Sequence, residues 1–172
     1  MHILYVADED SKYGASNSLL QLVSEIRKLD DSIKVSVVLT KNSNRVEDYQ
    51  KIGCDAYRIS YVPFCHGIPY EHWKIPLKWI IYGILYLYGR CASMKELERQ
   101  LDIRKVDMIH SNSTREDFGA TVAEKYGIPL VWHIREFDNL HYRCFSYRKN
   151  YVELMNHTAA KMIAISNAVK EH

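Results

Sequence analysis

Residues 131–137 combine the pattern of a short buried strand with three side chains that could do chemistry. An apolar run that includes Trp132 is followed at once by His133, Arg135 and Glu136. These residues supply a titratable base, a fixed cation and a carboxylate. In open parallel α/β sheets, ligands bind at the carboxyl ends of the strands. His133, Arg135 and Glu136 are therefore the candidate catalytic residues, if such a sheet positions them.

The rest of the sequence alternates between strand and helix patterns, read from apolar runs and from apolar residues three and four positions apart. Strands are predicted at residues 2–7, 33–39, 56–61, 106–110, 130–134 and 161–165, and helices at about 14–29, 45–52 and 77–101, between Ser113 and Gly127, at about 145–155, and after Ser166. This alternation predicts a single α/β domain over residues 1–172. It would be a Rossmann-like three-layer domain with a mainly parallel sheet of about six strands.

Sequence signals mark both ends of the helix between Ser113 and Gly127. Ser113 and Glu116 match the S-x-x-E pattern of a capping box, in which two side chains bond free amides at the first turn. Gly127 and Pro129 are typical of a helix end. Residues 62–76 hold three of the four prolines and are expected to form a long connection.

Polar or small residues also follow three other predicted strands. They are Asp8-Glu9-Asp10 and Gly14-Ala15-Ser16 after the first strand, His110-Ser111-Asn112-Ser113-Thr114 after the fourth, and Ser166-Asn167 after the last. Because parallel strands point the same way, all should lie at one edge of the sheet, beside His133. Small residues let the backbone approach a ligand, and helix N-termini offer free amides to an anion. This edge suits a phosphate-bearing molecule.

Each of these features also has a purely structural interpretation. A Gly-Ala-Ser turn can be only a tight turn, and Ser or Asn after a strand can be only a helix cap. His133 lies on the opposite sheet face from Trp132 and could be a hydrogen-bonded core residue. Arg135 and Glu136 could form a structural ion pair. The coincidence of four such strand ends gives the functional interpretation equal weight.

Composition and missing motifs exclude several functional classes. The chain has 23 Lys and Arg against 21 Asp and Glu, a net charge of +2, without a dense basic stripe, which argues against a nucleic-acid partner. Its four cysteines are widely spaced, so no metal site is expected. Residues 14–19 read GASNSL instead of the dinucleotide-binding G-x-G-x-x-G, and the third strand lacks the terminal Asp of a response-regulator receiver. No signal peptide is visible, which favours a cytoplasmic protein.

Four segments together resemble the N-terminal domain of a GT-B retaining glycosyltransferase of family 4. They are ILYVADEDSKYGASNSLLQL, VDMIHSNSTREDFGA, KYGIPLVWHIREF and KMIAISNAVKE, which span most of the chain outside residues 55–100. The resemblance implies an enzyme of about twice this length. This half would hold the acceptor, and a C-terminal domain, absent from this chain, would hold the nucleotide-sugar. No metal or other cofactor is implied, and this half alone is expected to be inactive.

The resemblance implies substrate-binding roles at two loops. The residues are Gly14, Ala15 and Ser16, in a turn near the donor diphosphate, and Ser111, Asn112 and Ser113, in a loop that faces the acceptor cleft. The turn would shape the floor of the cleft, and cations with helix N-termini would stabilise the leaving diphosphate.

The resemblance also frames the strand end at residues 131–137. Arg135 falls at the family's His and Glu136 at its acidic position, and both would orient the acceptor or the transferred sugar. His133 lies two residues earlier, on the same side of the strand as Arg135. Arg135 could bind an anion but could not act as a base at neutral pH.

The segment WKIPLKWIIYGILYLYGR at residues 73–90 allows two interpretations. Its uninterrupted apolar run, Trp79–Tyr88, is about half as long as a bilayer span requires. Its Trp and Tyr residues and basic flanks fit a helix in a membrane interface, and they fit a core helix equally well. Arg148 belongs to a second basic-aromatic segment, residues 142–151, which could also be a solvated helix face. If both segments lie on one side, a lipid-linked acceptor is expected.

These observations favour transfer of a sugar from a nucleotide-sugar donor to a glycan or lipid-linked acceptor, in the synthesis of a bacterial cell-surface polysaccharide. The expected setting is the cytoplasm, with peripheral contact at the inner face of the plasma membrane. Two alternatives stay open. One is a non-catalytic Rossmann-like module that binds a phosphate-bearing ligand. The other is a periplasmic-type sugar sensor, which the missing signal peptide disfavours.

Overall fold

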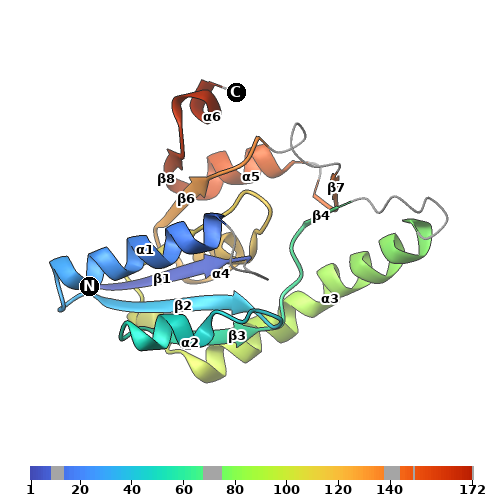
Figure 1. Cartoon of the computed structure of the whole chain (residues 1–172). Helices are drawn as coiled ribbons and strands as arrows, with labels where there is room; N and C mark the ends of the chain where they lie inside the picture. The colour runs from blue at the N-terminus through green and yellow to red at the C-terminus, as the bar shows by residue number, and fades with distance from the viewer. Residues whose placement is uncertain (9–13, 68–74, 138–143, 149, 172) are drawn as a thin grey trace.

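A computed structural model of the chain contains a six-stranded parallel sheet in the order β3-β2-β1-β5-β6-β8 (Figure 1). The strands are β1 (His2–Ala7), β2 (Lys34–Thr40), β3 (Asp55–Ile59), β5 (Met108–Ser111), β6 (Leu130–Ile134) and β8 (Ala159–Ala164). The structure describes residues 1–8, 14–67, 75–137, 144–148 and 150–171. All six residues of β1 are buried, as expected for a central parallel strand covered on both faces. The predicted fold class and the predicted number of strands are confirmed.

Helices cover both faces of the sheet. They are α1 (Gly14–Leu29), α2 (Val46–Lys51), α3 (Ile75–Gln100), α4 (Phe118–Tyr126), α5 (Tyr151–Thr158) and α6 (Asn167–Glu171). One apolar cluster joins α1 and α2 to the sheet through Leu19, Val23 and Tyr49. A second cluster joins α3, α4 and α5 to the other face, with Leu97 and Phe118 among its buried members. The predicted three-layer arrangement is therefore present.

The start of α4 differs from the prediction. The helix begins at Phe118, so Ser113 is not its N-cap. Glu116 caps it instead, because Glu116 Oε2 accepts hydrogen bonds from the backbone amides of Phe118 and Gly119 at 2.9 and 3.2 Å. The predicted capping box is therefore wrong about Ser113, although the carboxylate of Glu116 does cap the helix. The predicted end is correct, since Gly127 closes the helix with a φ of 67°.

A small antiparallel pair, β4 (Cys65–Gly67) and β7 (Cys144–Ser146), was not predicted. β4 lies inside the expected long connection. β7 occupies the start of the segment predicted as the helix 145–155, and α5 begins only at Tyr151. Three-residue strands are too short to show a period in the sequence, so pairing with a distant segment decides their structure.

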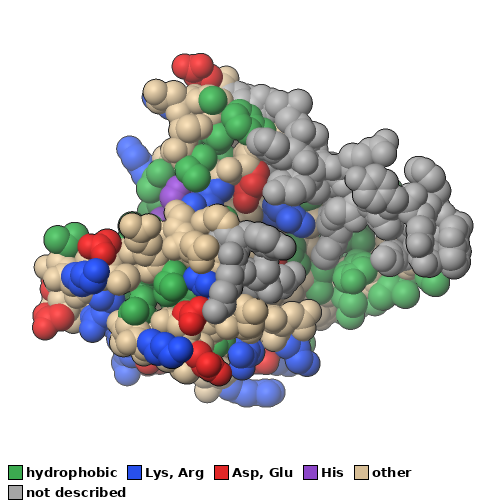
Figure 2. All heavy atoms as spheres, viewed as in Figure 1, with side chains coloured by type: hydrophobic (Ala, Val, Ile, Leu, Met, Phe, Trp, Pro, Cys, Tyr) green, Lys and Arg blue, Asp and Glu red, His purple; other side chains and the backbone are tan. Residues whose placement is uncertain are grey.

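Helix α3 is buried in its second half and exposed in its first. Met94 and Leu97 belong to the core, whereas Leu87 is 67% exposed and Tyr88 76% exposed. The first half projects from the body, and apolar side chains gather over it (Figures 1 and 2). Core packing is thus the wrong interpretation for most of the run from Trp79 to Tyr88. None of the helices in the described ranges is long and apolar enough to cross a membrane.

The two basic-aromatic segments meet on the inner side of α3. The rings of Tyr86 and Tyr147 stack with centroids 5.8 Å apart, and the Tyr147 hydroxyl donates to the backbone oxygen of Trp79 at 3.2 Å. Arg148 forms an ion pair at 3.2 Å with the fully buried Asp117, which α3 also contacts. At least residues 147 and 148 of the second segment therefore lie beside α3.

Candidate functional site

The candidate site lies where the strand order of the sheet reverses. β1 and β5 are hydrogen-bonded neighbours, and the chain continues outward from them to β2 on one side and β6 on the other. The carboxyl ends of two such strands border a crevice, which is the usual ligand site of open α/β sheets. Asp8 follows β1, and Asn112 follows β5 with its amide bonded to the oxygen of Val6 at 2.9 Å. Residues 9–13, including Glu9 and Asp10, lie outside the described residues.

Arg135 joins three elements at this crevice. Its Nε donates to Asn112 Oδ1 at 2.9 Å, and its Nη1 donates to Ser18 Oγ at 2.9 Å. Its Nη2 lies 3.4 Å from His133 Nδ1. Arg135 therefore links helix α1, the loop after β5 and the end of β6. The planar guanidinium makes these contacts in fixed directions, so its positive charge is held in one place.

His133 and His110 form a neutral pair beside Arg135. His110 Nε2 lies 3.4 Å from His133 Nδ1, and the His110 ring packs against the ring of Tyr5 in a tilted arrangement with centroids 4.8 Å apart. Burial lowers the pKa of each histidine to about 4, and the positive charge of Arg135 adds to the effect. Because Nδ1 of His133 faces the Arg135 donor, we assign the ring proton to Nε2. His133 is therefore suited to hydrogen bonding rather than to general-base catalysis at neutral pH.

Glu136 is held by the loop after β5. Its Oε1 accepts from Ser113 Oγ at 3.3 Å, and its Oε2 accepts from the Thr114 amide at 3.3 Å and from Thr114 Oγ1 at 3.0 Å. Trp132 fixes the same loop from the other sheet face, because its Nε1 donates to the Ser113 oxygen at 2.8 Å. The carboxylate is thus oriented but half-exposed, and it can still accept a hydrogen bond from a bound hydroxyl group.

The predicted substrate-binding residues divide into exposed and buried groups. Gly14 and Ala15 open α1 at the surface, and no described residue lies within 4 Å of the place where a Gly14 Cβ would stand. Ser16 is buried. Ser111, Asn112 and Ser113 are also buried. Asn112 and Ser113 hold Arg135 and Glu136, so any contact they make with a substrate passes through those two side chains.

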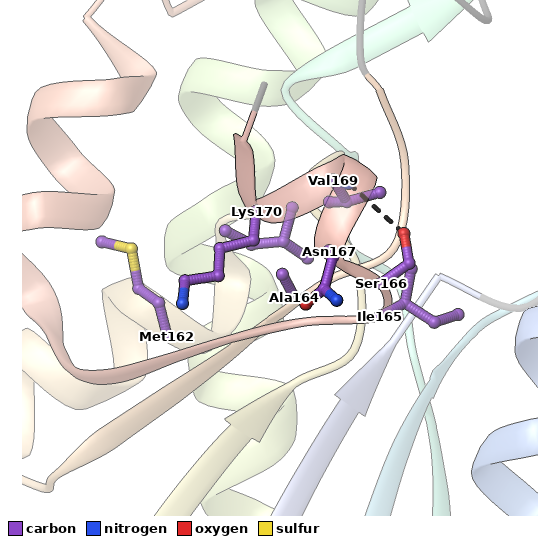
Figure 3. A pocket seen from close by; sticks show the side chains of 8 residues that line it. Met162, Ala164, Ile165, Ser166, Asn167, Val169 and Lys170 are labelled. Carbon is purple, nitrogen blue, oxygen red and sulfur yellow. Dashed lines mark hydrogen bonds between the residues drawn. The ribbon is translucent and has the colours of Figure 1, made fainter.

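A cavity opens beside the site, at the ends of β6 and β8 (Figure 3). It has a volume of about 640 Å³, and Ile134, Met162, Ala164, Ile165, Ser166, Asn167, Val169 and Lys170 line it. Ser166 Oγ accepts the Val169 amide at 3.3 Å, so it caps the short helix α6. The walls are mainly apolar, and one of the lining residues is Ile134, the residue before Arg135 in the chain. Within the described ranges, no group of His, Cys, Asp or Glu is placed to hold a metal ion.

Sequence reasoning missed two members of the site. One is Ser18 on α1, whose hydroxyl binds Arg135. The other is Glu116, which was predicted as the acidic member of a capping box with Ser113 but caps α4 by itself and is fully buried. Neither role has a local signal, because each depends on a partner on another strand or helix. The predicted sides of β6 are correct, since Trp132 packs with the α4 cluster while His133 faces Arg135 and α1.

No protein-family model matches the chain, and no curated protein matches it. Solved structures do match. The calicheamicin glycosyltransferase CalG4 is 19% identical over 99% of this chain and 40% of its own, with a TM-score of 0.51. Arabidopsis thaliana UGT89C1 with quercetin is 16% identical over 96% of this chain and 43% of its own, with a TM-score of 0.52. UGT89C1 with UDP gives the same TM-score at 14% identity.

At these identities the likeness concerns the fold. The chain spans about two fifths of the length of the solved structures that it matches. Its parallel sheet, its helical layers and the crevice at the strand reversal agree with that likeness. The chain therefore has the α/β fold of the N-terminal half of GT-B glycosyltransferases such as CalG4 and UGT89C1.

Proposed function

We propose that this chain is the acceptor-side domain of a retaining, family-4-like glycosyltransferase. The enzyme transfers a sugar from a nucleotide-sugar to a glycan or lipid-linked acceptor in bacterial cell-surface polysaccharide synthesis. The observation that carries the proposal is the placement of Arg135 and Glu136 at the strand reversal, each held by side chains from other elements. UGT89C1 was solved with UDP and with UDP-L-rhamnose, and VinC with DTDP, which supports a nucleotide-sugar as the donor class.

The donor needs a second domain in this proposal. The chain spans 40–43% of the matching chains of CalG4 and UGT89C1. In the full-length enzyme, a second α/β domain binds the nucleotide and closes over the crevice described above. The domain of residues 1–172 alone then lacks turnover. No metal ion is needed, because Arg135 and the open N-terminal turn of α1 at Gly14 and Ala15 supply positive potential to the diphosphate.

The site residues have distinct roles in this scheme. Glu136 accepts a hydrogen bond from the acceptor or from the transferred sugar and so orients it. Arg135 acts through its fixed charge rather than as a base. His133 is neutral and holds the Arg135 side chain in place by accepting a hydrogen bond from it. Gly14, Ala15 and Ser16 shape the floor of the cleft, and Ser111, Asn112 and Ser113 hold the two charged side chains.

A glycosyltransfer assay on the full-length enzyme tests the proposal. We expect Glu136→Ala to lower kcat by about 100-fold or more, the scale of a lost positioning contact, with the fold retained. Glu124→Ala, an exposed change on α4, is the matched control and should keep full turnover. Unchanged turnover in Glu136→Ala would remove Glu136 from the mechanism. Nucleotide-sugar binding without any transfer would favour the non-catalytic binding module instead.

We propose further that the first half of α3 rests in a membrane interface and brings the enzyme to a lipid-linked acceptor. Its exposed apolar side chains are Leu77, Trp79, Ile80, Ile81, Tyr82, Ile84, Leu85, Leu87 and Tyr88. No Asp or Glu occurs from residue 72 to residue 95, while Lys74, Lys78, Arg90 and Lys95 do. Exposed aromatic and aliphatic residues with only basic neighbours are typical of helices at anionic lipid surfaces.

The inner side of α3 connects this surface to the site. The side chains of Tyr86 and Arg90 both contact Asp117. Asp117 stands directly before α4 and next to Glu116, the residue that caps this helix. An acceptor whose lipid lies along α3 would therefore have its polar end close to the loop that holds Glu136.

Liposome flotation tests the membrane proposal. The protein should float with vesicles rich in anionic lipid, and Leu87→Glu with Tyr88→Glu should abolish flotation. Leu29→Glu is the matched control, because Leu29 is 85% exposed at the far end of α1. Protein that stays in the unbound fraction with every vesicle composition would show that α3 does not bind lipid.

A further inference from the structure

Glu116 is a fully buried carboxyl group that the proposed chemistry does not use. Its Oε2 accepts two hydrogen bonds, from the amides of Phe118 and Gly119 at 2.9 and 3.2 Å. Its Oε1 has no hydrogen-bond partner among the described residues. The hydroxyl of Ser111, a fully buried residue at the end of β5, also has no hydrogen-bond partner among the described residues. Two polar atoms are thus buried in one region without a formed bond, which costs stability unless they satisfy each other.

Gly119 brings these two groups into the same space. A Cβ at Gly119 would lie 2.3 Å from Ser111 Oγ and 3.5 Å from Glu116 Oε1. Both atoms therefore border the space that a side chain at position 119 would fill, and which glycine leaves open. A carboxyl group that carries a proton on Oε1 can donate to the Ser111 hydroxyl oxygen, whereas an ionised one can only accept the Ser111 proton, so the charges around the carboxyl decide between the two.

The charges near Glu116 disfavour its ionised form. Asp117 on the same segment is a carboxylate, and the nearby guanidinium groups of Arg90 on α3 and Arg148 after β7 are both paired with Asp117. The imidazole of His110 on β5 is neutral at pH 7, because burial lowers its pKa to about 4. Glu136, at the end of β6, brings another carboxylate to the loop that follows β5. Burial raises the pKa of Glu116 to about 8, the charge of Asp117 adds to the rise, and the amides of Gly119 and Phe118 offset it only in part.

We propose that Glu116 is a neutral carboxylic acid in the working protein and donates its Oε1 proton to Ser111 Oγ, which positions the loop that holds Glu136. The bond ties the end of β5 to the residue that caps α4, on either side of Asn112, Ser113 and Thr114. Glu116 is a positioning residue and touches no substrate. The inference rests on the proposed function only where turnover is measured, because the state of the carboxyl group can be measured without it.

The protonation state predicts a definite pH dependence of stability. The unfolded chain releases the Glu116 proton near pH 4.3, whereas the folded chain keeps it until about pH 8. Between these values the folded state binds the extra proton, so the free energy of unfolding falls as pH rises. The stabilisation is complete below the unfolded pKa and is lost as pH rises through the folded pKa. Glu116→Gln cannot ionise, and its amide N–H can still donate to Ser111 Oγ.

Thermal unfolding of wild type, Glu116→Gln and Glu124→Gln from pH 5 to pH 9 tests the inference. Relative to Glu116→Gln, the wild type should lose roughly 5 to 10 °C in Tm over this range, and Glu124→Gln should parallel the wild type. Identical pH dependence of wild type and Glu116→Gln would overturn the inference. If Glu116→Gln fails to fold, carbon NMR of the Glu116 carboxyl in the wild type decides. A protonated carboxyl at pH 7 supports the inference, and a carboxylate refutes it.

Turnover of the full-length enzyme separates this inference from the proposed function. We expect the alkaline limb of the kcat profile in the wild type to be displaced to higher pH in Glu116→Gln, with KM changed little. Glu116→Ala should lower kcat at every pH. An enzyme without transferase activity would refute the proposed function and leave the unfolding and NMR results standing. A kcat profile that is the same in wild type and Glu116→Gln would refute the positioning role.

Discussion

Arg135 Nη1 and Ser18 Oγ are 2.9 Å apart, although 117 positions separate the two residues in the chain. This hydrogen bond fastens helix α1 to the end of β6 across the crevice between β1 and β5. It holds the partly exposed guanidinium group of Arg135 beside Ser18, near the start of α1. The geometry of the crevice therefore depends on a side chain that no local pattern marked.

Arg135→Lys should keep the charge and lose the geometry. A lysine cannot bond Asn112, Ser18 and His133 at once, because its single ammonium group lacks the planar fork. We expect a loss of about 1–3 kcal/mol in the free energy of unfolding, the range for hydrogen bonds to charged groups. Urea denaturation measures it. Ser18→Ala removes one of the contacts and should cost less than Arg135→Lys, and equal costs would contradict this assignment.

The pair His110 and His133 should make the protein acid-sensitive. Burial lowers the pKa of both to about 4, so the unfolded chain binds protons between pH 6.5 and pH 4 that the folded chain does not. The free energy of unfolding should therefore fall as pH drops through this window. His133→Asn should reduce the loss by roughly 1 kcal/mol in denaturant titrations at pH 7 and pH 4.5. His157→Asn, on the exposed side of α5, should leave the pH dependence as it is.

Asp117→Asn should be among the more damaging single changes outside the apolar core. The carboxylate is fully buried and pairs with Arg90 and Arg148, and it accepts the Tyr86 hydroxyl at 2.7 Å. Removing its charge leaves two guanidinium groups without a counter-ion, which costs about 3–5 kcal/mol when a pair is buried. Chemical denaturation provides the measurement. Asp102→Asn breaks an exposed pair with Lys105 and should cost under about 1 kcal/mol.

Gly119→Ala and Gly89→Ala should act in opposite directions. Alanine normally favours a helix over glycine by about 1 kcal/mol. At Gly89 on α3, no described residue beyond its own stretch of helix lies within 4 Å of an added Cβ, so Gly89→Ala should stabilise the protein. At Gly119 the added Cβ would lie 2.3 Å from Ser111 Oγ, and we expect a net loss of about 1–3 kcal/mol.

A second variant tests the cause of the Gly119→Ala effect. Ser111→Ala removes the crowded oxygen, so the double variant should be more stable than the sum of the two single effects. Simple additivity in this double-mutant cycle would mean that the Ser111 hydroxyl is not the obstacle. The free energies come from the same denaturation experiment as the single variants.

The parts of the fold that could be predicted are those with a strong local pattern. Helix α1 and strand β6 begin and end where the spacing of apolar residues placed them, and Gly127 ends α4 as expected. The strand pattern also put His133 and Arg135 on one side of β6. The short strands β4 and β7 were missed because they pair with each other across a long stretch of sequence. The same limit applies to the Ser18–Arg135 contact.

The two remaining errors concern burial, which composition does not determine. The apolar run of α3 looks like a core helix, yet Leu87 and Tyr88 are exposed, because no other layer of the described domain covers that half of the helix. Glu116 has the pattern of a capping-box carboxylate, a role that leaves its exposure open, and it is fully buried where α4 starts two residues after it. In both cases the packing of neighbouring elements overrides the usual preference of the residue type.

The strand order has a consequence for how this site is made. β1 pairs with β5, so the crevice has only one wall until the chain has reached residue 111, and Arg135 arrives later still. Contacts between such distant positions close long loops and form slowly compared with helices. During synthesis α1 emerges before β6, so Ser18 cannot bond Arg135 until β6 has been made. A pulse-labelled chain should therefore protect the amides of α1 from exchange only after β5 and β6 have joined the sheet.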